Sequence, residues 1–281
     1  MHFHEKPNTY VTNVEIKVSN LQRSLNYYQE VIGFNVLKQE ANKATLTADG
    51  HTALLTIVQP ETLEEKTSIT TGLFHFALLL PSRRDLANFI THARQMGIYF
   101  GASDHDVSEA LYLNDPDENG IEIYIDRPEE KWTWIADQVH MVTEPLNIAD
   151  ILNEATGDWN GLPANTVMGH IHLSISNLAA AEEFYTKGLG FDVVTRYGRQ
   201  ALFLSTGRYH HHIGLNTWYS ENASKLGENQ VGLKTFSLFL DNETQAADMK
   251  EQLRALGAPI VEIEGGFQTE DPAGIIVQLK F

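Results

Sequence analysis

The sequence has no cysteine and is short of basic residues. Its 281 residues include 20 Lys and Arg against 37 Asp and Glu, which gives a formal net charge of −17. Without cysteine there is no disulfide framework, no thiolate metal site and no thiol nucleophile. The excess of negative charge argues against a nucleic-acid partner, because the phosphates would be repelled.

Long apolar segments are also missing. No run of 18 apolar residues occurs, and the first ten residues, MHFHEKPNTY, lack the apolar core of a secretory signal. We therefore expect a cytoplasmic protein with no membrane partner. Apolar residues still make up 42% of the chain, which is enough to bury a sizeable core.

The sequence contains one segment that occurs twice and aligns with its copy without a gap. Residues 13–34 and 170–191 both read as a strand, the triplet Ser-Asn-Leu, a short amphipathic helix with a tyrosine near its end, and Gly-Phe opening another strand. A fixed internal repeat bears directly on the architecture. The copies differ at one informative position, because His170 stands where the first copy has Asn13.

A second pair of repeats fills the space between the first. A strand at 75–80 is followed by a predicted helix at about 83–96. A strand at 235–240 is followed by a predicted helix at about 244–256. In both copies the helix has apolar residues at helical spacing and ends at a glycine. Both copies then close with an Asp-Pro turn and a last strand.

Each of these four units reads strand–helix–strand–strand–strand. A single unit cannot bury both its helix face and its sheet face, so the units must pair. We predict an α+β fold in which four βαβββ modules pair into two sheet-barrel cavities. Residues 1–128 would hold modules one and two, and residues 167–281 modules three and four. Residues 129–166 form a connector that is too apolar to be disordered.

Four segments carry a resemblance to a known superfamily. They are GLFHFALLLP, DHDVSEALYLNDPDENGIEIYIDRP, GHIHLSISNL and HHHIGLN. Together with the fourfold repeat, they resemble the vicinal-oxygen-chelate superfamily, which includes glyoxalase I, antibiotic-resistance proteins and extradiol ring-cleaving dioxygenases. The chain looks most like two-domain bacterial catechol 2,3-dioxygenase-type proteins. The resemblance covers nearly the whole chain apart from the connector.

In this superfamily a module can offer one metal ligand at the start of its first strand and another in its last strand. The first-strand positions are Asn13, His75, His170 and Thr235, and the last-strand positions are about Thr56, Glu122, the His212–Gly214 region and Gln278. The neutral Asn, Thr and Gln side chains are poor ligands, which leaves His75, Glu122 and His170. Pairing modules within each half would divide these three residues between two sites.

Pairing the second module with the third would instead unite the three residues as two histidines and one carboxylate. This set suits non-haem Fe(II) with open positions for other ligands. We predict this inner pairing and an Fe(II) cofactor, with Mn, Zn and Ni as alternative metals. The outer pair of modules, which carries Asn13, Thr235 and Gln278, would then form a degenerate cavity.

A histidine run in the third module supplies a further candidate. Alternation along a strand puts His210 and His212 on one face and His211 on the other. By the resemblance, His212 sits where the superfamily has an acid–base histidine beside the metal. Its expected role is to take a proton from a substrate hydroxyl and return it later.

Other candidates lie near the predicted ligands. By the resemblance, Tyr112 matches a tyrosine that hydrogen-bonds the metal-bound substrate oxygen. His105 lies on the loop before the same strand and is placed to reach the mouth of the cavity. Phe76 and His172 are expected to supply cavity walls, because each lies within two residues of a predicted ligand.

The leading interpretation is an extradiol dioxygenase that cleaves a catechol or a related dihydroxylated aromatic. One alternative is a metal-dependent glyoxalase-type isomerase or a thiol-transfer resistance enzyme, which usually needs a carboxylate base and often a fourth protein ligand. Another is a binding protein that sequesters an aromatic compound without catalysis. The expected partners are a small aromatic substrate and O₂, and a homodimer is left open.

Overall fold

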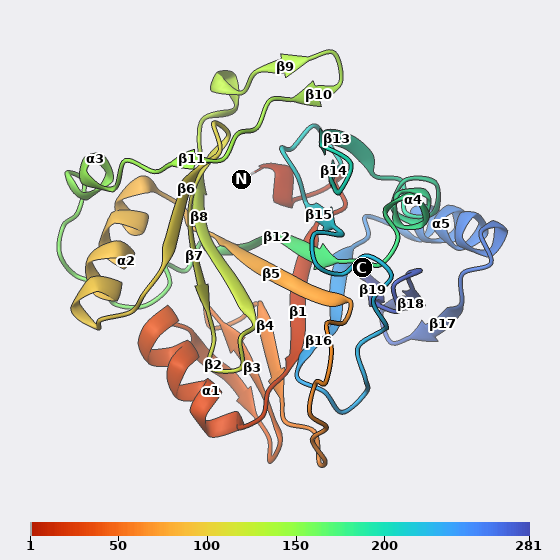
Figure 1. Cartoon of the computed structure of the whole chain (residues 1–281), viewed down its shortest axis with the longest axis horizontal. Helices are drawn as coiled ribbons and strands as arrows, with labels where there is room; N and C mark the ends of the chain where they lie inside the picture. Colours follow the sequence, from red (N-terminus) through yellow and green to blue (C-terminus); the bar gives the residue numbers. More distant parts are fainter. Residues whose placement is uncertain (1) are drawn as a thin grey trace.

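The first of two large sheets in the computed structural model, which describes residues 2–281, has eight strands (Figure 1). They are β1 (Val11–Lys17), β2 (Asn35–Gln39), β3 (Lys43–Thr47), β4 (Leu55–Val58), β16 (Gly232–Phe239), β17 (Ile260–Ile263), β18 (Gly266–Glu270) and β19 (Ile276–Lys280). Their spatial order is β17-β18-β19-β16-β1-β4-β3-β2.

The second sheet has nine strands. They are β5 (Gly72–Leu79), β6 (Gly101–Asp104), β7 (Ser108–Asn114), β8 (Gly120–Asp126), β11 (Glu144–Pro145), β12 (Val167–Ser174), β13 (Asp192–Tyr197), β14 (Ala201–Ser205) and β15 (Ile213–Asn216). Their spatial order is β11-β6-β7-β8-β5-β12-β15-β14-β13. A separate hairpin of β9 (Trp134–Ile135) and β10 (Gln138–Val139) extends from the body at the top of Figure 1.

Five helices of the described chain pack against the sheets, and the apolar residues that they bury belong to the same core as those of both sheets. They are α1 (Leu21–Tyr27), α2 (Arg83–Gln95), α3 (Ile148–Leu152), α4 (Leu178–Glu183) and α5 (Glu243–Ala255), with short turns η1 (His2–His4), η2 (Tyr28–Ile32), η3 (Glu129–Lys131) and η4 (Phe184–Gly188). The predicted helices at about 83–96 and 244–256 correspond to α2 and α5. Within residues 2–281, no helix is long and apolar enough to cross a membrane.

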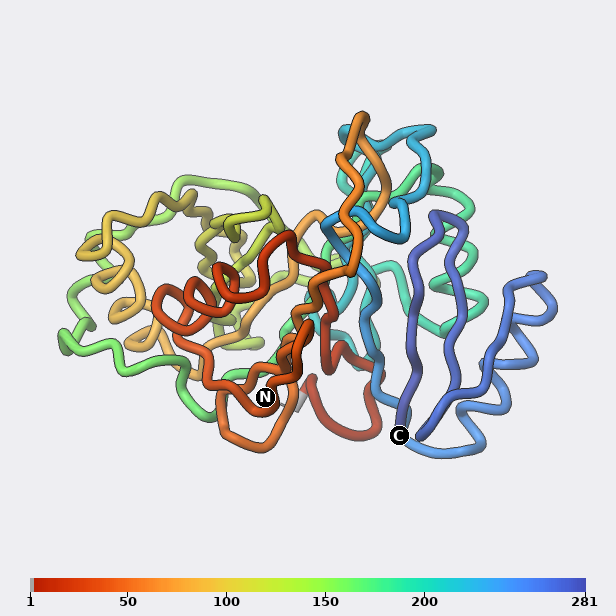
Figure 2. The backbone as a smooth tube through the Cα atoms, turned by 90° about the horizontal axis from the view of Figure 1, so that it is seen from below, coloured from red at the N-terminus to blue at the C-terminus, as the bar shows by residue number. Residues whose placement is uncertain are grey.

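The four modules have the predicted order of elements. They span residues 11–58, 72–126, 167–216 and 232–280. The nine-stranded sheet combines the second and third modules, and the eight-stranded sheet combines the first and fourth. The predicted α+β fold and the predicted pairing of the inner modules are therefore confirmed. In Figure 2 α2 of the second module, yellow, and α5 of the fourth, blue, lie at opposite ends of the molecule.

Neither sheet is confined to one predicted half of the chain. Residues 1–128 and 167–281 each contribute one module to each sheet. The connector at 129–166 packs on the body, since Trp132 and Val139 are buried and β11 pairs with β6. The boundaries of the two halves and of the connector stay a prediction.

A buried tyrosine–aspartate pair links the two modules within each half. The Tyr28 hydroxyl donates to Asp115 Oδ2 at 2.9 Å, and the Tyr185 hydroxyl donates to Asp271 Oδ2 at 3.1 Å. Both aspartates belong to the Asp-Pro turns of the repeat, and both also accept backbone N–H groups of their own turn. Hydrogen bonds thus connect modules along the chain, while the sheets connect modules across it.

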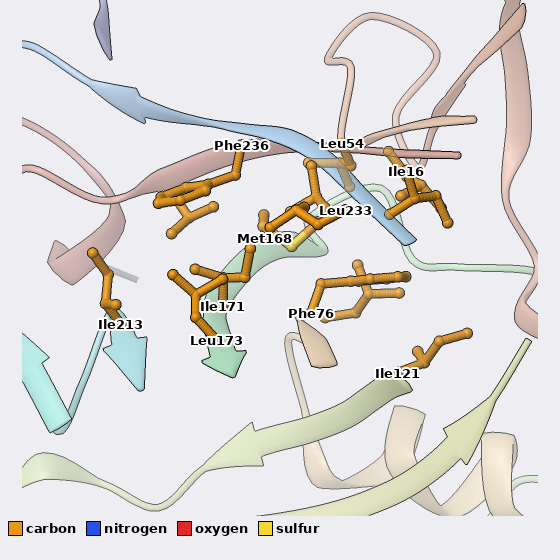
Figure 3. Close-up of a cluster of buried hydrophobic side chains, with 14 of the residues drawn as sticks. Ile16, Leu54, Phe76, Ile121, Met168, Ile171, Leu173, Ile213, Leu233 and Phe236 are labelled. Carbon is orange, nitrogen blue, oxygen red and sulfur yellow. The ribbon is translucent and has the colours of Figure 1, made fainter. Parts of the chain in front are cut away.

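The main hydrophobic core lies between the two sheets. Figure 3 shows Phe236 and Ile16 from the eight-stranded sheet facing Phe76 and Ile171 from the nine-stranded sheet. Each of these four side chains is fully buried. Because side chains alternate along a strand, the residues next to Phe76 and Ile171 point to the opposite face of the nine-stranded sheet. That opposite face carries the candidate site.

Truncating a side chain in this core should destabilise the fold. We expect Phe236→Ala to lower the free energy of unfolding by about 3–5 kcal/mol, because the surrounding sheets cannot collapse into the space left behind. Urea denaturation followed by circular dichroism measures this. Tyr99→Ala is the control, since Tyr99 is 94% exposed and should change stability by less than about 0.5 kcal/mol. Equal effects of the two changes would contradict the placement of the core.

Candidate metal centre and active site

Three neighbouring strands carry the predicted metal ligands. His75 lies on β5, Glu122 on β8 and His170 on β12, and these strands are adjacent in the order β8-β5-β12. Strands β5 and β12 run antiparallel with His170 opposite Ala77, while β8 runs parallel to β5 with Glu122 also opposite Ala77. The register therefore places a ligand on each side of β5 at the same level.

The three side chains converge on one point of the polar face. His75 Nε2 lies 2.9 Å and His170 Nε2 3.0 Å from the same Glu122 oxygen, Oε2. One donor atom from each residue lies within 4.8 Å of the others. All three side chains are buried. The structure thus brings together the residues that the sequence divides between the two halves.

This donor set fits a divalent cation. A buried carboxylate needs a cationic partner or a metal, and its partners here are two imidazoles. Burial raises the pKa of Glu122, but His170 and His75 lower it by more, so the pKa of this carboxyl lies well below its usual range. Burial lowers the pKa of His170, which favours the neutral form that a metal requires.

A cavity of about 590 Å³ opens beside this cluster. Its apolar wall consists of Phe74, Leu113, Ile121, Met141, Phe203 and Trp218. Its polar groups include two of the three predicted ligands, His75 and Glu122. Among the described residues that line it, none is lysine or arginine. An apolar pocket with a few convergent polar groups is typical of a small-molecule site.

Tyr112 and His105 both line the cavity and bond each other. The Tyr112 hydroxyl lies 2.6 Å from His105 Nε2, and His105 Nδ1 lies 2.6 Å from the Val142 carbonyl oxygen. The carbonyl can only accept, so Nδ1 carries the proton and Nε2 accepts from the hydroxyl. Burial, together with the charge of Glu122, raises the pKa of Tyr112 well above its ordinary value. The phenol is therefore held neutral, with its oxygen beside the ligands.

His211, rather than His212, is the member of the histidine run that lines the cavity. Its ring centroid lies 4.1 Å from that of His170. The His212 ring lies outside the cavity, where Nε2 contacts the Phe3 carbonyl at 3.1 Å and Nδ1 accepts the Thr206 N–H at 3.3 Å. The predicted acid–base position for His212 is therefore corrected.

The prediction failed because it extended strand alternation beyond the strand. Strand β15 begins at Ile213, and Gly214 faces the cavity side, where an added Cβ would lie 2.8 Å from the His172 ring. Strict alternation from Gly214 would bring His212 into the cavity. The chain bends at His212 instead, and the ring packs against the N-terminal segment. No local signal in the run marks this bend.

One of the two residues predicted to form the cavity wall lines the cavity, and the other does not. His172 lines the cavity, and its Nε2 has no hydrogen-bond partner within the described chain. Burial lowers the pKa of His172 well below the ordinary histidine value, so this ring is neutral. Phe76 does not line the cavity, because it points into the core between the sheets (Figure 3). Phe74, two residues earlier, lines the cavity in its place.

The equivalent positions of the outer modules carry neutral side chains that bond the sheet itself. Asn13 Nδ2 donates to the Ala53 carbonyl at 3.3 Å, and Thr235 Oγ1 donates to the Ile276 carbonyl at 2.9 Å. Gln278 Oε1 accepts from a neighbouring serine hydroxyl, that of Ser237, at 3.4 Å. The side chains of these three outer residues are therefore engaged in hydrogen bonds within the outer modules.

The paired βαβββ modules and the ligand positions define a vicinal-oxygen-chelate protein. The model of the Glyoxalase/Bleomycin resistance protein/Dioxygenase superfamily matches residues 10–123 and 167–279. The chain belongs to this superfamily. The two matched stretches coincide with the two halves of the sequence repeat, and together they cover the chain apart from its ends and the connector.

Two comparisons with known proteins concern the sequence and two the fold. The chain is 41% identical over 268 residues to catechol-2,3-dioxygenase of Bacillus subtilis (strain 168), covering 94% of each protein. It is 31% identical over 121 residues to biphenyl-2,3-diol 1,2-dioxygenase 3 of Rhodococcus globerulus, covering 41% of this chain and 64% of that protein. A second Bacillus subtilis protein superposes with a TM-score of 0.67 at 12% identity, covering 98% of this chain and 86% of that chain. Glyoxalase I from Zea mays gives 0.57 at 15% identity, covering 97% and 92%. The two structural matches show the shared fold alone.

Removal of a predicted ligand should abolish metal binding, whereas removal of its counterpart in the outer modules should leave metal binding unchanged. We expect His75→Ala to weaken Fe(II) binding by more than about 100-fold, because changes to residues that merely orient a ligand already cost 10–100-fold. Thr235→Ala, at the equivalent position of the fourth module, should keep its metal. Metal analysis after anaerobic loading with Fe(II) and desalting measures both. Full metal content in His75→Ala would rule out the assigned centre.

Proposed function

We propose that this protein is an extradiol ring-cleaving dioxygenase that acts on a catechol or a related dihydroxylated aromatic. Fe(II) would be held by His75, Glu122 and His170. The observation that carries the proposal is the convergence of two histidines and one glutamate at the wall of an apolar cavity. The identity to a Bacillus subtilis catechol-2,3-dioxygenase over nearly the full length of both chains supports a dioxygenase.

The metal would supply two things when bound. Fe(II) on a 2-His-1-carboxylate set offers open positions for two substrate oxygens and O₂, and it lowers the pKa of a coordinated hydroxyl. The surrounding residues would bind and orient the ring. Phe74 and Trp218 lie with their ring centroids 5.3 Å apart at the cavity wall, and such aromatic surfaces suit a planar aromatic substrate.

His211 would act as the acid–base residue. Its ring lines the cavity with its centroid 4.1 Å from that of His170, so a hydroxyl bound near that ligand would lie beside this imidazole. Burial lowers the pKa of His211 well below the ordinary histidine value, so the free ring is neutral and able to accept a proton. It would take the proton of the second substrate hydroxyl and return it as the ring opens.

Tyr112 would orient a substrate oxygen. Its hydroxyl proton is directed to His105 Nε2, which leaves the phenol oxygen with lone pairs toward the cavity. That oxygen can accept a hydrogen bond from a substrate hydroxyl. His105 would act through Tyr112, and the Val142 carbonyl holds His105 in the required tautomer.

The cavity favours a substrate whose ring substituents carry no charge. The described lining contains no lysine or arginine, while Glu122 and Glu118 contribute carboxylates. A carboxylated catechol would bury its charge without a cationic partner and beside like charge. An alkyl or aryl substituent would instead contact the apolar wall.

Oxygen uptake with a matched pair of catechols tests this proposal. The Fe(II)-loaded protein should consume O₂ and form a yellow ring-fission product with 4-methylcatechol. The value of kcat/KM should be more than about tenfold lower with 3,4-dihydroxybenzoate, because an unpaired buried charge costs over 1 kcal/mol. Bound iron without oxygen uptake on any catechol would contradict a dioxygenase, and absence of metal binding would favour a sequestering protein.

The choice between neighbouring histidines gives a second test. We expect His211→Gln to lower kcat by about 100-fold or more, the usual contribution of a general acid–base group. His212→Gln is the matched control, because His212 is also buried but lies outside the cavity, so its kcat should stay within about twofold of wild type. Steady-state oxygen consumption measures both variants. The reverse order of effects would return the acid–base role to His212.

A further inference from the structure

A hydrogen-bonded cluster behind His211 has no part in the chemistry described so far. His211 Nδ1 lies 2.8 Å from His210 Nδ1, and His210 Nε2 lies 2.8 Å from Asp126 Oδ1. The same Asp126 oxygen accepts the Tyr209 hydroxyl at 3.1 Å, and the Tyr209 oxygen lies 2.7 Å from the Tyr124 hydroxyl. His210 is fully buried, while the Asp126 side chain is 22% exposed. The cluster therefore runs from the cavity wall to the edge of solvent.

The chemistry of these groups sets the direction of each hydrogen bond. A carboxylate only accepts, so His210 Nε2 must carry the proton that points to Asp126. In a neutral ring the other nitrogen, His210 Nδ1, then has only a lone pair. The proton between the two Nδ1 atoms therefore belongs to His211. His211 Nε2 is left as a lone pair, and it is this ring that lines the cavity.

The opposite direction conflicts with the same distances. If neutral His210 donated from Nδ1, its Nε2 lone pair would face the Asp126 carboxylate at 2.8 Å, which places two acceptors against each other. The surroundings also hold the ring in place, because Tyr209 and Trp132 pack with their ring centroids 4.0 Å and 5.2 Å from that of His210. With a neutral His210, one arrangement of protons satisfies every member of the cluster.

We propose that Asp126 and His210 are positioning residues that hold His211 in its Nδ1–H tautomer, with Nε2 free toward the cavity as the base. This inference rests on the proposed function of His211. A carboxylate usually bonds directly to the histidine that it orients, whereas here the carboxylate of Asp126 acts through a second imidazole, that of His210. Because His210 donates its Nε2 proton to Asp126, its Nδ1 accepts the hydrogen bond from His211 Nδ1–H.

The tautomers can be read directly without turnover. We would record two-bond ¹H–¹⁵N spectra of histidine-labelled protein loaded with Zn(II), at a pH well above the ordinary histidine pKa of about 6.5. Variants His210→Gln and His211→Gln assign the signals. We expect His211 as the Nδ1–H form and His210 as the Nε2–H form. The Nε2–H form at His211, or a doubly protonated His210, would overturn the proposal.

A graded series at Asp126 tests the effect on catalysis. Asp126→Ala removes the acceptor and should lower kcat by roughly 10–100-fold, the range for residues that orient a functional group, with KM and iron content within about twofold. Asp126→Asn keeps an oxygen that can accept from His210, so it should retain more of the rate and the wild-type tautomer at His211. His212→Gln is the control from the same histidine run.

The outcomes separate the two proposals. Loss of rate in Asp126→Ala with an unchanged His211 tautomer would contradict the positioning role. Equal losses of kcat and iron content would assign Asp126 a structural role alone and would also contradict it. The expected tautomers in a protein that cleaves no catechol would leave the positioning inference standing and overturn the proposed function.

Discussion

The antiparallel seam between β5 and β12 is the constraint on which the site depends. It joins the second module to the third, and its register sets His172 opposite His75 and His170 opposite Ala77. Because the side-chain period of a strand is two residues, a shift of one residue would turn the histidines of either strand toward the core. The large apolar residues between the sheets oppose such a shift, since it would expose them.

The two faces of the nine-stranded sheet differ: one packs into the hydrophobic core and the other carries the candidate site. One face is apolar and packs on the eight-stranded sheet, as Figure 3 shows for Phe76, Ile171 and Ile213. The other gathers carboxylate, imidazole and phenol groups in a buried setting, where unpaired polar groups are costly. Buried polar atoms such as His172 Nε2 and His170 Nδ1 lack protein partners within the described residues. That cost is tolerable where a metal, substrate or water can satisfy them.

Duplication with divergence explains the asymmetry of the molecule. The tyrosine–aspartate pairs, Tyr28 with Asp115 and Tyr185 with Asp271, recur in both halves because they hold consecutive modules together. The ligand positions do not recur. The three predicted ligands come from the inner modules alone, while the matching positions of the outer modules carry Asn13, Thr235 and Gln278.

Much of this could be predicted from the sequence because it depends on local patterns. The four modules follow from the repeats, and the three ligands follow from comparing repeat positions, since Asn, Thr and Gln are poor alternatives to His and Glu. Tyr112 and His105 also come together as expected, because both belong to one strand and its preceding loop. The ligand positions and Tyr112 were inferred from the resemblance to the superfamily, while the modules were inferred from sequence spacing alone.

The remaining features depend on contacts between distant segments. His211 replaces His212 at the cavity because the chain bends just before β15 and the N-terminal turn bonds the His212 ring. The orienting carboxylate of Asp126 lies 84 residues away from its partner His210 in sequence. The sequence alone determined the modules and the residue types at the predicted ligand positions, because repeats and side-chain chemistry are local properties. The tertiary structure decided which imidazole faces the cavity and what lies behind it, because a ring's direction depends on the groups that pack against it.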